Sequence, residues 1–72
     1  MIVRLRRSIL DRWIVVNAQD DRVDAYGWSG SRWVPIDRDG LPAGSVQVSN
    51  FDKREAAAEY ARNFGFQVAK ET

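Results

Sequence analysis

Apolar residues recur at helical spacing in the C-terminal third of the chain. Ala57, Tyr60, Ala61 and Phe64 are spaced i, i+3, i+4 and i+7, which places them on one face of an α-helix. Gly65 follows this stripe directly, and glycine is the residue that most readily ends a helix in the left-handed conformation. The pattern predicts a helix over residues 53–64 whose apolar face lies on another element.

The start of this helix carries a capping signal. Asp52 and Glu55 have the spacing of a capping box, in which the Asp52 side chain accepts the backbone N–H of Glu55 and the Glu55 side chain reaches back. Such a cap is worth about 1 kcal/mol. We therefore expect Asp52 to begin the helix.

Short segments with strand-like patterns fill the rest of the chain. They lie at residues 2–5, 12–17, 22–28, 32–36, 45–49 and 66–68. Pro35 cannot donate to a central ladder, so its strand is expected at an edge. Several strands, one helix and one strand predict a single α+β domain over residues 1–72. We expect an antiparallel sheet of four to five short strands with one C-terminal helix packed on one face, followed by a final short strand.

The composition argues against an enzyme. The 72 residues include no histidine and no cysteine, which removes the commonest general base, the commonest metal ligands and the thiol nucleophile. We expect no catalytic residue, no metal and no cofactor. The alternative, an enzyme that uses carboxylates, would draw on two clusters near predicted turns: Asp20, Asp21 and Asp24, and Asp37 and Asp39. Because aspartates commonly cap amides in turns, we favour a structural role for both clusters.

The chain shows no signal for a membrane or for secretion. No apolar run approaches the roughly 20 residues that span a bilayer. The N-terminal residues also lack the apolar region and the cleavage site of a secretory signal. These observations predict a cytoplasmic protein without a membrane span.

The N-terminus concentrates positive charge. Residues 1–12 hold four arginines against one aspartate, a balance of +3, in a chain whose net charge is +1. On a strand, Arg4 and Arg6 would project from one face, and with Arg7, Arg12 and a nearby tryptophan they could bind nucleic acid. We favour the alternative of an edge strand protected from aggregation by its charges, because nucleic-acid binders usually carry a larger basic surplus.

Two tryptophans flank a short polar bend. Trp28 and Trp33 enclose Ser29, a glycine and a second serine. Because tryptophan is enriched at interaction hot spots, Trp28, Ser29 and Trp33 form a candidate protein-binding site. The same tryptophans could instead fill the core of a domain this small.

These residues, taken in order, resemble a known family. Trp13, the Gly27-Trp28-Ser29 sequence, the run from Phe51 to Ala61 and the closing Gly65-Phe66 are similar to the C-terminal region of the 18-kilodalton accessory subunit family of respiratory complex I. The resemblance covers roughly residues 12–69. It implies a fold with one helix on a small sheet, no cofactor and no catalysis, and a role in bracing a larger assembly.

Together the patterns predict a small non-enzymatic protein-interaction module. Its partner is expected to be another protein or a protein complex. A nucleic-acid-binding domain and a small inhibitor or adaptor encoded by a mobile element are the alternatives. The partner's identity and the oligomeric state cannot be read from the residues.

Overall fold

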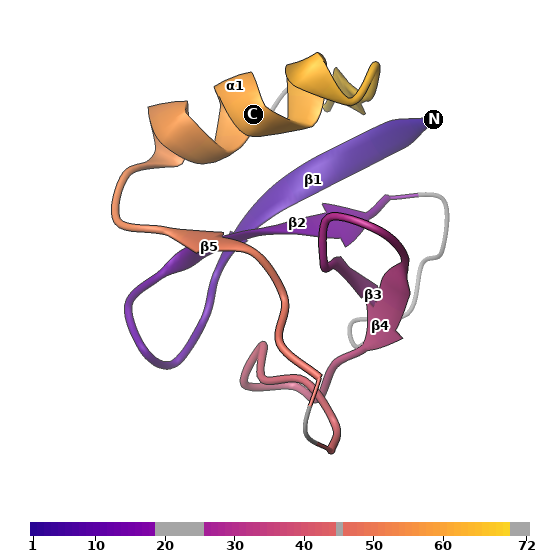
Figure 1. Cartoon of the computed structure of the whole chain (residues 1–72). Helices are drawn as coiled ribbons and strands as arrows, with labels where there is room; N and C mark the ends of the chain where they lie inside the picture. Colours follow the sequence, from indigo (N-terminus) through magenta and orange to yellow (C-terminus); the bar gives the residue numbers. More distant parts are fainter. Residues whose placement is uncertain (19–25, 45, 70–72) are drawn as a thin grey trace.

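The chain folds as one mixed β-sheet with an α-helix across one face (Figure 1). The computed structural model describes residues 1–18, 26–44 and 46–69. In chain order the elements are β1 (Ile2–Arg7), β2 (Trp13–Asn17), β3 (Tyr26–Trp28), β4 (Trp33–Pro35), β5 (Asn50–Phe51), α1 (Arg54–Asn63) and β6 (Gln67–Val68). The predicted α+β class, with its short strands, single helix and final strand, is confirmed for these residues.

The strands are arranged in the order β4-β3-β2-β1-β6, and β5 pairs with the free part of β2. All pairings are antiparallel except that of β6, which runs parallel to β1 with Ile2 opposite Gln67. The parallel pairing follows from the connection. The helix α1 carries the chain across the sheet from β5, so that β6 enters beside β1 and runs in the same direction as β1. The sheet is therefore mixed rather than wholly antiparallel.

The N-terminal strand is enclosed on both sides only at its start. β2 pairs with β1 on one side, and β6 pairs with the other side at Ile2 and Val3, so the prediction of a charged edge strand is wrong for this part of β1. The edge at the opposite end is β4, as expected from Pro35, whose missing N–H would leave a gap in a central ladder.

Apolar side chains fill both faces of the sheet. Val3, Leu5 and Val15 lie on the face covered by α1, whereas Ile14 and Val16 lie on the other face. All five are at most 5% exposed. Consecutive burial of residues 14–16 identifies β2 as the central strand, since its side chains enter both cores.

The helix lies close to the sheet because its inner face is made of alanines. Ala57 and Ala61 are fully buried against Val3 and Val15, and Ala58 is nearly so. Side chains this small let the helix backbone approach the strands. The predicted apolar face is confirmed at these positions. α1 has ten residues, and none of the described segments forms a helix long and apolar enough to cross a membrane.

The two ends of the helix differ in how well the sequence predicted them. The N-cap residue is Lys53, with no side-chain hydrogen bond, so the predicted Asp52 capping box is absent and the helix begins at Arg54. At the other end, Gly65 has a φ of +82°, its N–H donates to Arg62 O, and the N–H of Phe66 donates to Ala61 O. This pair of bonds is a Schellman motif, as expected from the glycine.

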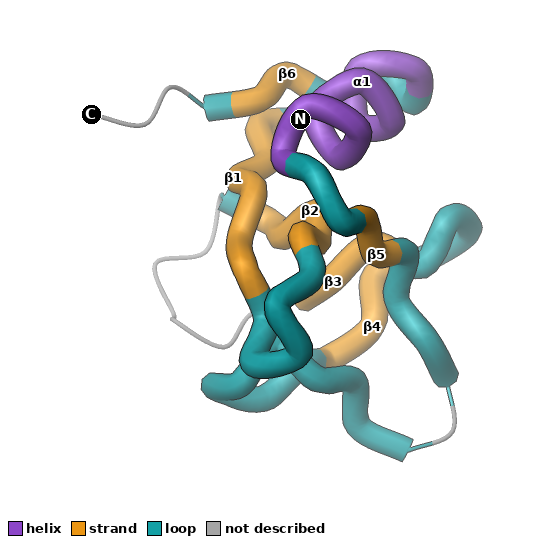
Figure 2. The backbone as a smooth tube through the Cα atoms, turned by 90° about the vertical axis from the view of Figure 1, so that its left-hand side faces the viewer, coloured by secondary structure: helices purple, strands orange, loops and turns teal. Residues whose placement is uncertain are grey.

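The face opposite the helix is covered by irregular chain from residues 36–44 and 46–49 (Figure 2). The strand predicted over residues 45–49 is absent from its described part, and pairing starts only at Asn50. Val48 is nevertheless buried, in the apolar cluster with Ile14 and Val16. The alternating pattern therefore indicated a buried side chain correctly, although the segment forms no strand hydrogen bonds. Gly27 permits this cover, because a Cβ there would lie 2.8 Å from Val48 Cγ1.

Candidate functional site

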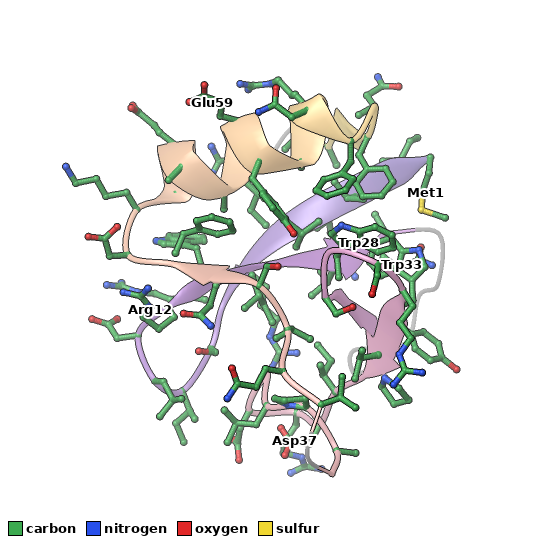
Figure 3. The ribbon with its side chains drawn as sticks, viewed as in Figure 1. Met1, Arg12, Trp28, Trp33, Asp37 and Glu59 are labelled. Carbon is green, nitrogen blue, oxygen red and sulfur yellow. The ribbon has the colours of Figure 1, made fainter. Side chains whose placement is uncertain are left out.

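The two candidate tryptophans lie directly opposite each other on a hairpin. Trp28 in β3 pairs with Trp33 in β4, and their ring centroids are 5.0 Å apart at an angle of 57°. Cross-strand aromatic pairs of this kind stabilise a hairpin. Both side chains are half-buried, so each packs on the core and also reaches the surface. Figure 3 shows the pair beneath the C-terminal end of the helix.

Ser29 has a structural role in this hairpin. Its backbone N–H donates to Arg32 O at 3.0 Å, and its hydroxyl accepts the backbone N–H of Arg32 at 3.2 Å. The hydroxyl also lies 3.0 Å from Arg32 O. These bonds close the turn at Gly30, whose φ of +102° suits glycine. Ser29 therefore holds the turn that sets the spacing of Trp28 and Trp33.

Two phenylalanines from the end of the helix complete the site. Phe64 and Phe66 stand nearly edge-on to Trp28, with centroid distances of 5.4 Å and 5.2 Å. Phe66 also lies 5.7 Å from Trp33, and the two phenylalanine rings are 6.0 Å apart. We name these four residues, Trp28, Trp33, Phe64 and Phe66, the aromatic surface.

The helix C-terminus explains the geometry of the aromatic surface. Phe64 is the C-cap, with φ −87° and ψ 1°, and the Schellman turn at Gly65 reverses the chain so that Phe66 returns toward the hairpin. Phe64 was expected to face the sheet as the last member of the apolar stripe. It is instead 45% exposed, because the helix ends at Asn63 and the ring extends over the hairpin.

Trp28 is the centre of the aromatic surface. Its ring contacts those of the other three members. Its indole N–H is buried and finds no hydrogen-bond acceptor among the described residues. Trp28 therefore acts mainly as the support on which the more accessible Phe64 is held.

Further aromatic contacts fix the helix above the sheet. Tyr60 lies 4.9 Å from Phe64 and 4.9 Å from Phe51, as measured between ring centroids. Its hydroxyl is 2.7 Å from Ser49 Oγ, a hydrogen-bonding distance. The aromatic surface thus continues into packed structure on one side, which limits the motion of its rings.

The candidate arginines are divided between surfaces. Arg4 and Arg6 project away from the helix, since Val3 and Leu5 face it, and Arg6 donates to Arg38 O. Arg7 is on the helix side, paired with Asp11 and 5.9 Å from the ring centre of Trp13. Arg12 lies elsewhere, with Nε 2.9 Å from Asn50 Oδ1. The structure does not bring the four side chains to one site.

The candidate carboxylates show a turn-capping arrangement where they are described. Asp37 Oδ1 accepts the backbone N–H groups of Asp39 at 2.9 Å and Leu41 at 3.0 Å. The cluster of Asp20, Asp21 and Asp24 lies outside the described residues. Within the described ranges no three acidic, histidine or cysteine side chains come together as metal ligands.

Comparison with known proteins provides no relative for this site: no family model, no curated protein and no solved structure matches the chain. The resemblance to the complex I accessory subunit family therefore stays a prediction from the residues.

Proposed function

We propose that this chain is a small protein-interaction module that binds its partner through the aromatic surface. The observation that carries the proposal is the exposure of Phe64. A phenylalanine that is 45% exposed and held in place by Trp28, Tyr60 and Phe66 has the character of a binding anchor.

Two physical properties support a binding role for the aromatic surface. Its members offer large apolar area with few rotatable bonds, so little side-chain entropy is lost when a partner covers them. The rings are already packed against one another, and a partner therefore meets a preformed surface. An aromatic centre of this kind is typical of protein interfaces.

The proposal includes a role for this module as a component of a larger protein assembly. The resemblance to an accessory subunit favours a bracing role, and a small inhibitor or adaptor would use the same aromatic surface. We also propose a cytoplasmic location, with which the absence of cysteine is compatible. The nucleic-acid alternative has less support, because Arg7 is paired with an aspartate and faces away from Arg4 and Arg6.

Phe64→Lys is expected to reduce partner binding by about thirtyfold, the loss of a typical 2 kcal/mol hot spot. The change places a charge where apolar area would be buried. Because Phe64 is nearly half exposed, the fold should survive. The measurement is capture from an extract of the source cells on immobilised wild-type and variant protein, quantified by mass spectrometry.

Ile2→Lys is the matched control for this experiment. Ile2 has the same 45% exposure, but it lies on β1 and faces away from the helix. Proteins retained by wild type and Ile2→Lys and lost from Phe64→Lys would support the proposal. If every captured protein binds all three baits equally while thermal melting shows each of them folded, the aromatic surface is not the binding site.

A further inference from the structure

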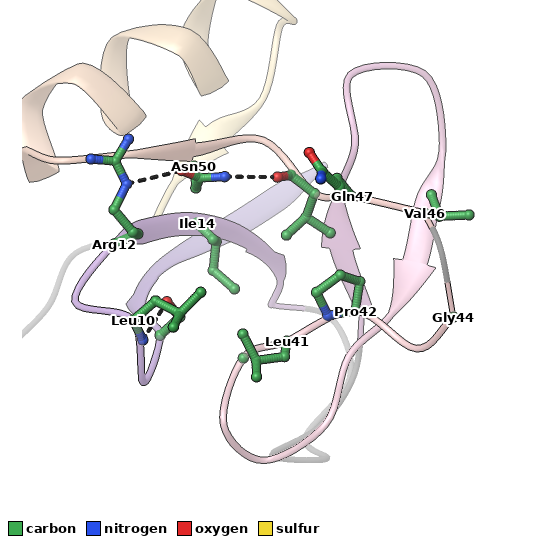
Figure 4. Close-up of a pocket in the computed structure, with 12 residues that line it drawn as sticks. Leu10, Arg12, Ile14, Leu41, Pro42, Gly44, Val46, Gln47 and Asn50 are labelled. Atoms are coloured by element: carbon green, nitrogen blue, oxygen red, sulfur yellow. Dashed lines mark hydrogen bonds between the residues drawn. The ribbon is translucent and has the colours of Figure 1, made fainter.

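A groove of about 420 Å³ opens on the face of the sheet opposite the helix (Figure 4). One wall is formed by the turn between β1 and β2, and the other by the chain around residues 41–42. Ile14 of β2 reaches into it from the sheet, and the segment leading to β5 closes one side. This groove is separate from the aromatic surface. Figure 3 places Arg12, at its rim, and the two tryptophans on opposite sides of the molecule.

The groove is lined by both apolar and polar side chains, with the apolar area larger. Leu10, Ile14, Leu41 and Val46 contribute aliphatic side chains, and Pro42 adds its ring. Leu10 is 67% exposed although it lines the groove, and the neighbouring Ile9 is 65% exposed. The apolar area thus extends beyond the groove onto the tip of the β1–β2 turn, where large exposed aliphatic side chains are unfavourable unless something covers them.

One cation stands at the rim of this groove, oriented by a hydrogen bond from Nε. Arg12 Nε donates to Asn50 Oδ1 at 2.9 Å, and Asn50 Nδ2 donates to Val48 O at 3.2 Å. The Nη groups of Arg12 have no carboxylate partner among the residues that the structure describes. Arg12 is also the one charged side chain among the described lining residues. A guanidinium held through Nε presents its remaining N–H groups as a fork, the geometry that suits a carboxylate.

The charge and the shape together select the class of ligand. A mainly apolar groove with a single cation at its rim complements an apolar group that carries one negative charge. The groove is near the lower end of small-molecule pockets, which are about 300–1,000 Å³. A free organic acid in the groove would leave the exposed Ile9 uncovered, whereas a polypeptide could cover it as well.

We propose that this groove binds the C-terminus of a partner polypeptide. The last side chain, an aliphatic or aromatic one, lies on Ile14 between Leu10 and Leu41, and the terminal carboxylate binds the Nη groups of Arg12. The preceding residues cross the tip of the β1–β2 turn. The site goes beyond the aromatic surface and does not depend on it.

Amidation of the peptide tests the proposal on the wild-type protein. The probes are short glycine-serine peptides that end in leucine or phenylalanine, each with a free carboxylate or as the C-terminal amide. Two-dimensional ¹⁵N NMR titration into the millimolar range should shift the amides of Leu10, Arg12, Val46 and Asn50. The amide peptides should bind at least about tenfold more weakly, since a charge-assisted hydrogen bond is lost.

Arg12→Gln should give a similar loss for the free-carboxylate peptides, because glutamine can still bond to Asn50 but carries no charge. Arg12→Lys should retain part of the affinity. The amidation comparison is independent of whether these variants fold.

Four results of the titrations with added ligand would overturn the proposal. They are equal binding of acid and amide peptides, no shift with any peptide, peptide-induced shifts confined to the aromatic surface, and octanoate binding in the groove at least as tightly as the leucine peptide. The last would assign the site to a free organic acid. Concentration-dependent shifts of the groove amides without peptide would instead show a second copy of this chain in the groove, and would equally contradict it. The Phe64→Lys prediction is tested separately, by the capture experiment.

Discussion

Ala61→Leu is expected to lower the free energy of unfolding by about 1–3 kcal/mol, the usual cost of adding bulk to a packed core. Ala61 is 0% exposed and lies between α1 and the sheet, against Val3 and Val15. A leucine there must push the helix away from the strands or adopt a strained rotamer. In a domain of 60–100 residues each kcal/mol shifts the melting temperature by about 4–8 °C, so thermal unfolding followed by circular dichroism will detect it.

Ala56→Leu provides the matched control on the same helix. Ala56 is exposed, and alanine and leucine both favour helix, so the melting temperature should change little. Equal effects of the two substitutions would mean that the helix does not lie on the sheet by its Ala57 and Ala61 face.

Gly40→Ala is expected to cost about 2–4 kcal/mol, the sum of a left-handed backbone penalty of about 1–2 kcal/mol and the cost of a steric clash. Gly40 has a φ of +80°, and a Cβ there would lie 3.0 Å from Ser8 Cβ and 3.1 Å from Ser8 Cα. Because one of these atoms belongs to the backbone, the β1–β2 turn would have to move. Urea unfolding measures the change.

Gly44→Ala separates the backbone penalty from the cost of the steric clash. Gly44 has a nearly identical φ of +78°, but a Cβ added there would have no described atom within 4 Å apart from those of its chain neighbours. This variant should lose only about 1–2 kcal/mol. If Gly40→Ala is no more destabilising than Gly44→Ala, the loop after β4 does not pack against Ser8 as described.

The helix was the element most open to prediction, because its signals are local. The spacing of Ala57 and Ala61 indicates which face of the helix is buried, and Gly65 indicates where the helix ends. The beginning was predicted incorrectly, since Asp52 and Glu55 match a capping box but Lys53 takes the N-cap position. A capping motif depends only on residue types and their spacing. The residue at which the helix starts also depends on where the chain leaves β5, which the motif does not determine.

The strands were less predictable because pairing depends on distant residues. Val46 and Val48 alternate with polar residues as a strand would, yet no strand forms over the described part of that segment. Both valines pack instead against apolar side chains on the face of the sheet opposite the helix. The placement of the start of β1 inside the sheet depends on β6, which lies more than 60 residues later in the chain and is only two residues long.

The aromatic surface was predicted in part. Trp28 and Trp33 stand out as a pair near a bend, and the hairpin does bring them together. Phe64 and Phe66 were assigned to the helix face and the last strand, since nothing local indicates that the Schellman turn directs both toward β3. The groove was missed for the same reason, because its walls come from separate segments that only the tertiary fold assembles.

Hydroxyl-radical footprinting of the module, alone and in complex with a captured partner, tests the proposed function most directly. The rate of oxidation of each exposed side chain is read by mass spectrometry. We expect oxidation of Phe64 and Trp33 to fall several-fold in the complex, while that of the half-buried Trp13, which lies outside the aromatic surface, stays unchanged. Unchanged oxidation of Phe64 and Trp33 in a stable complex would contradict binding through the aromatic surface.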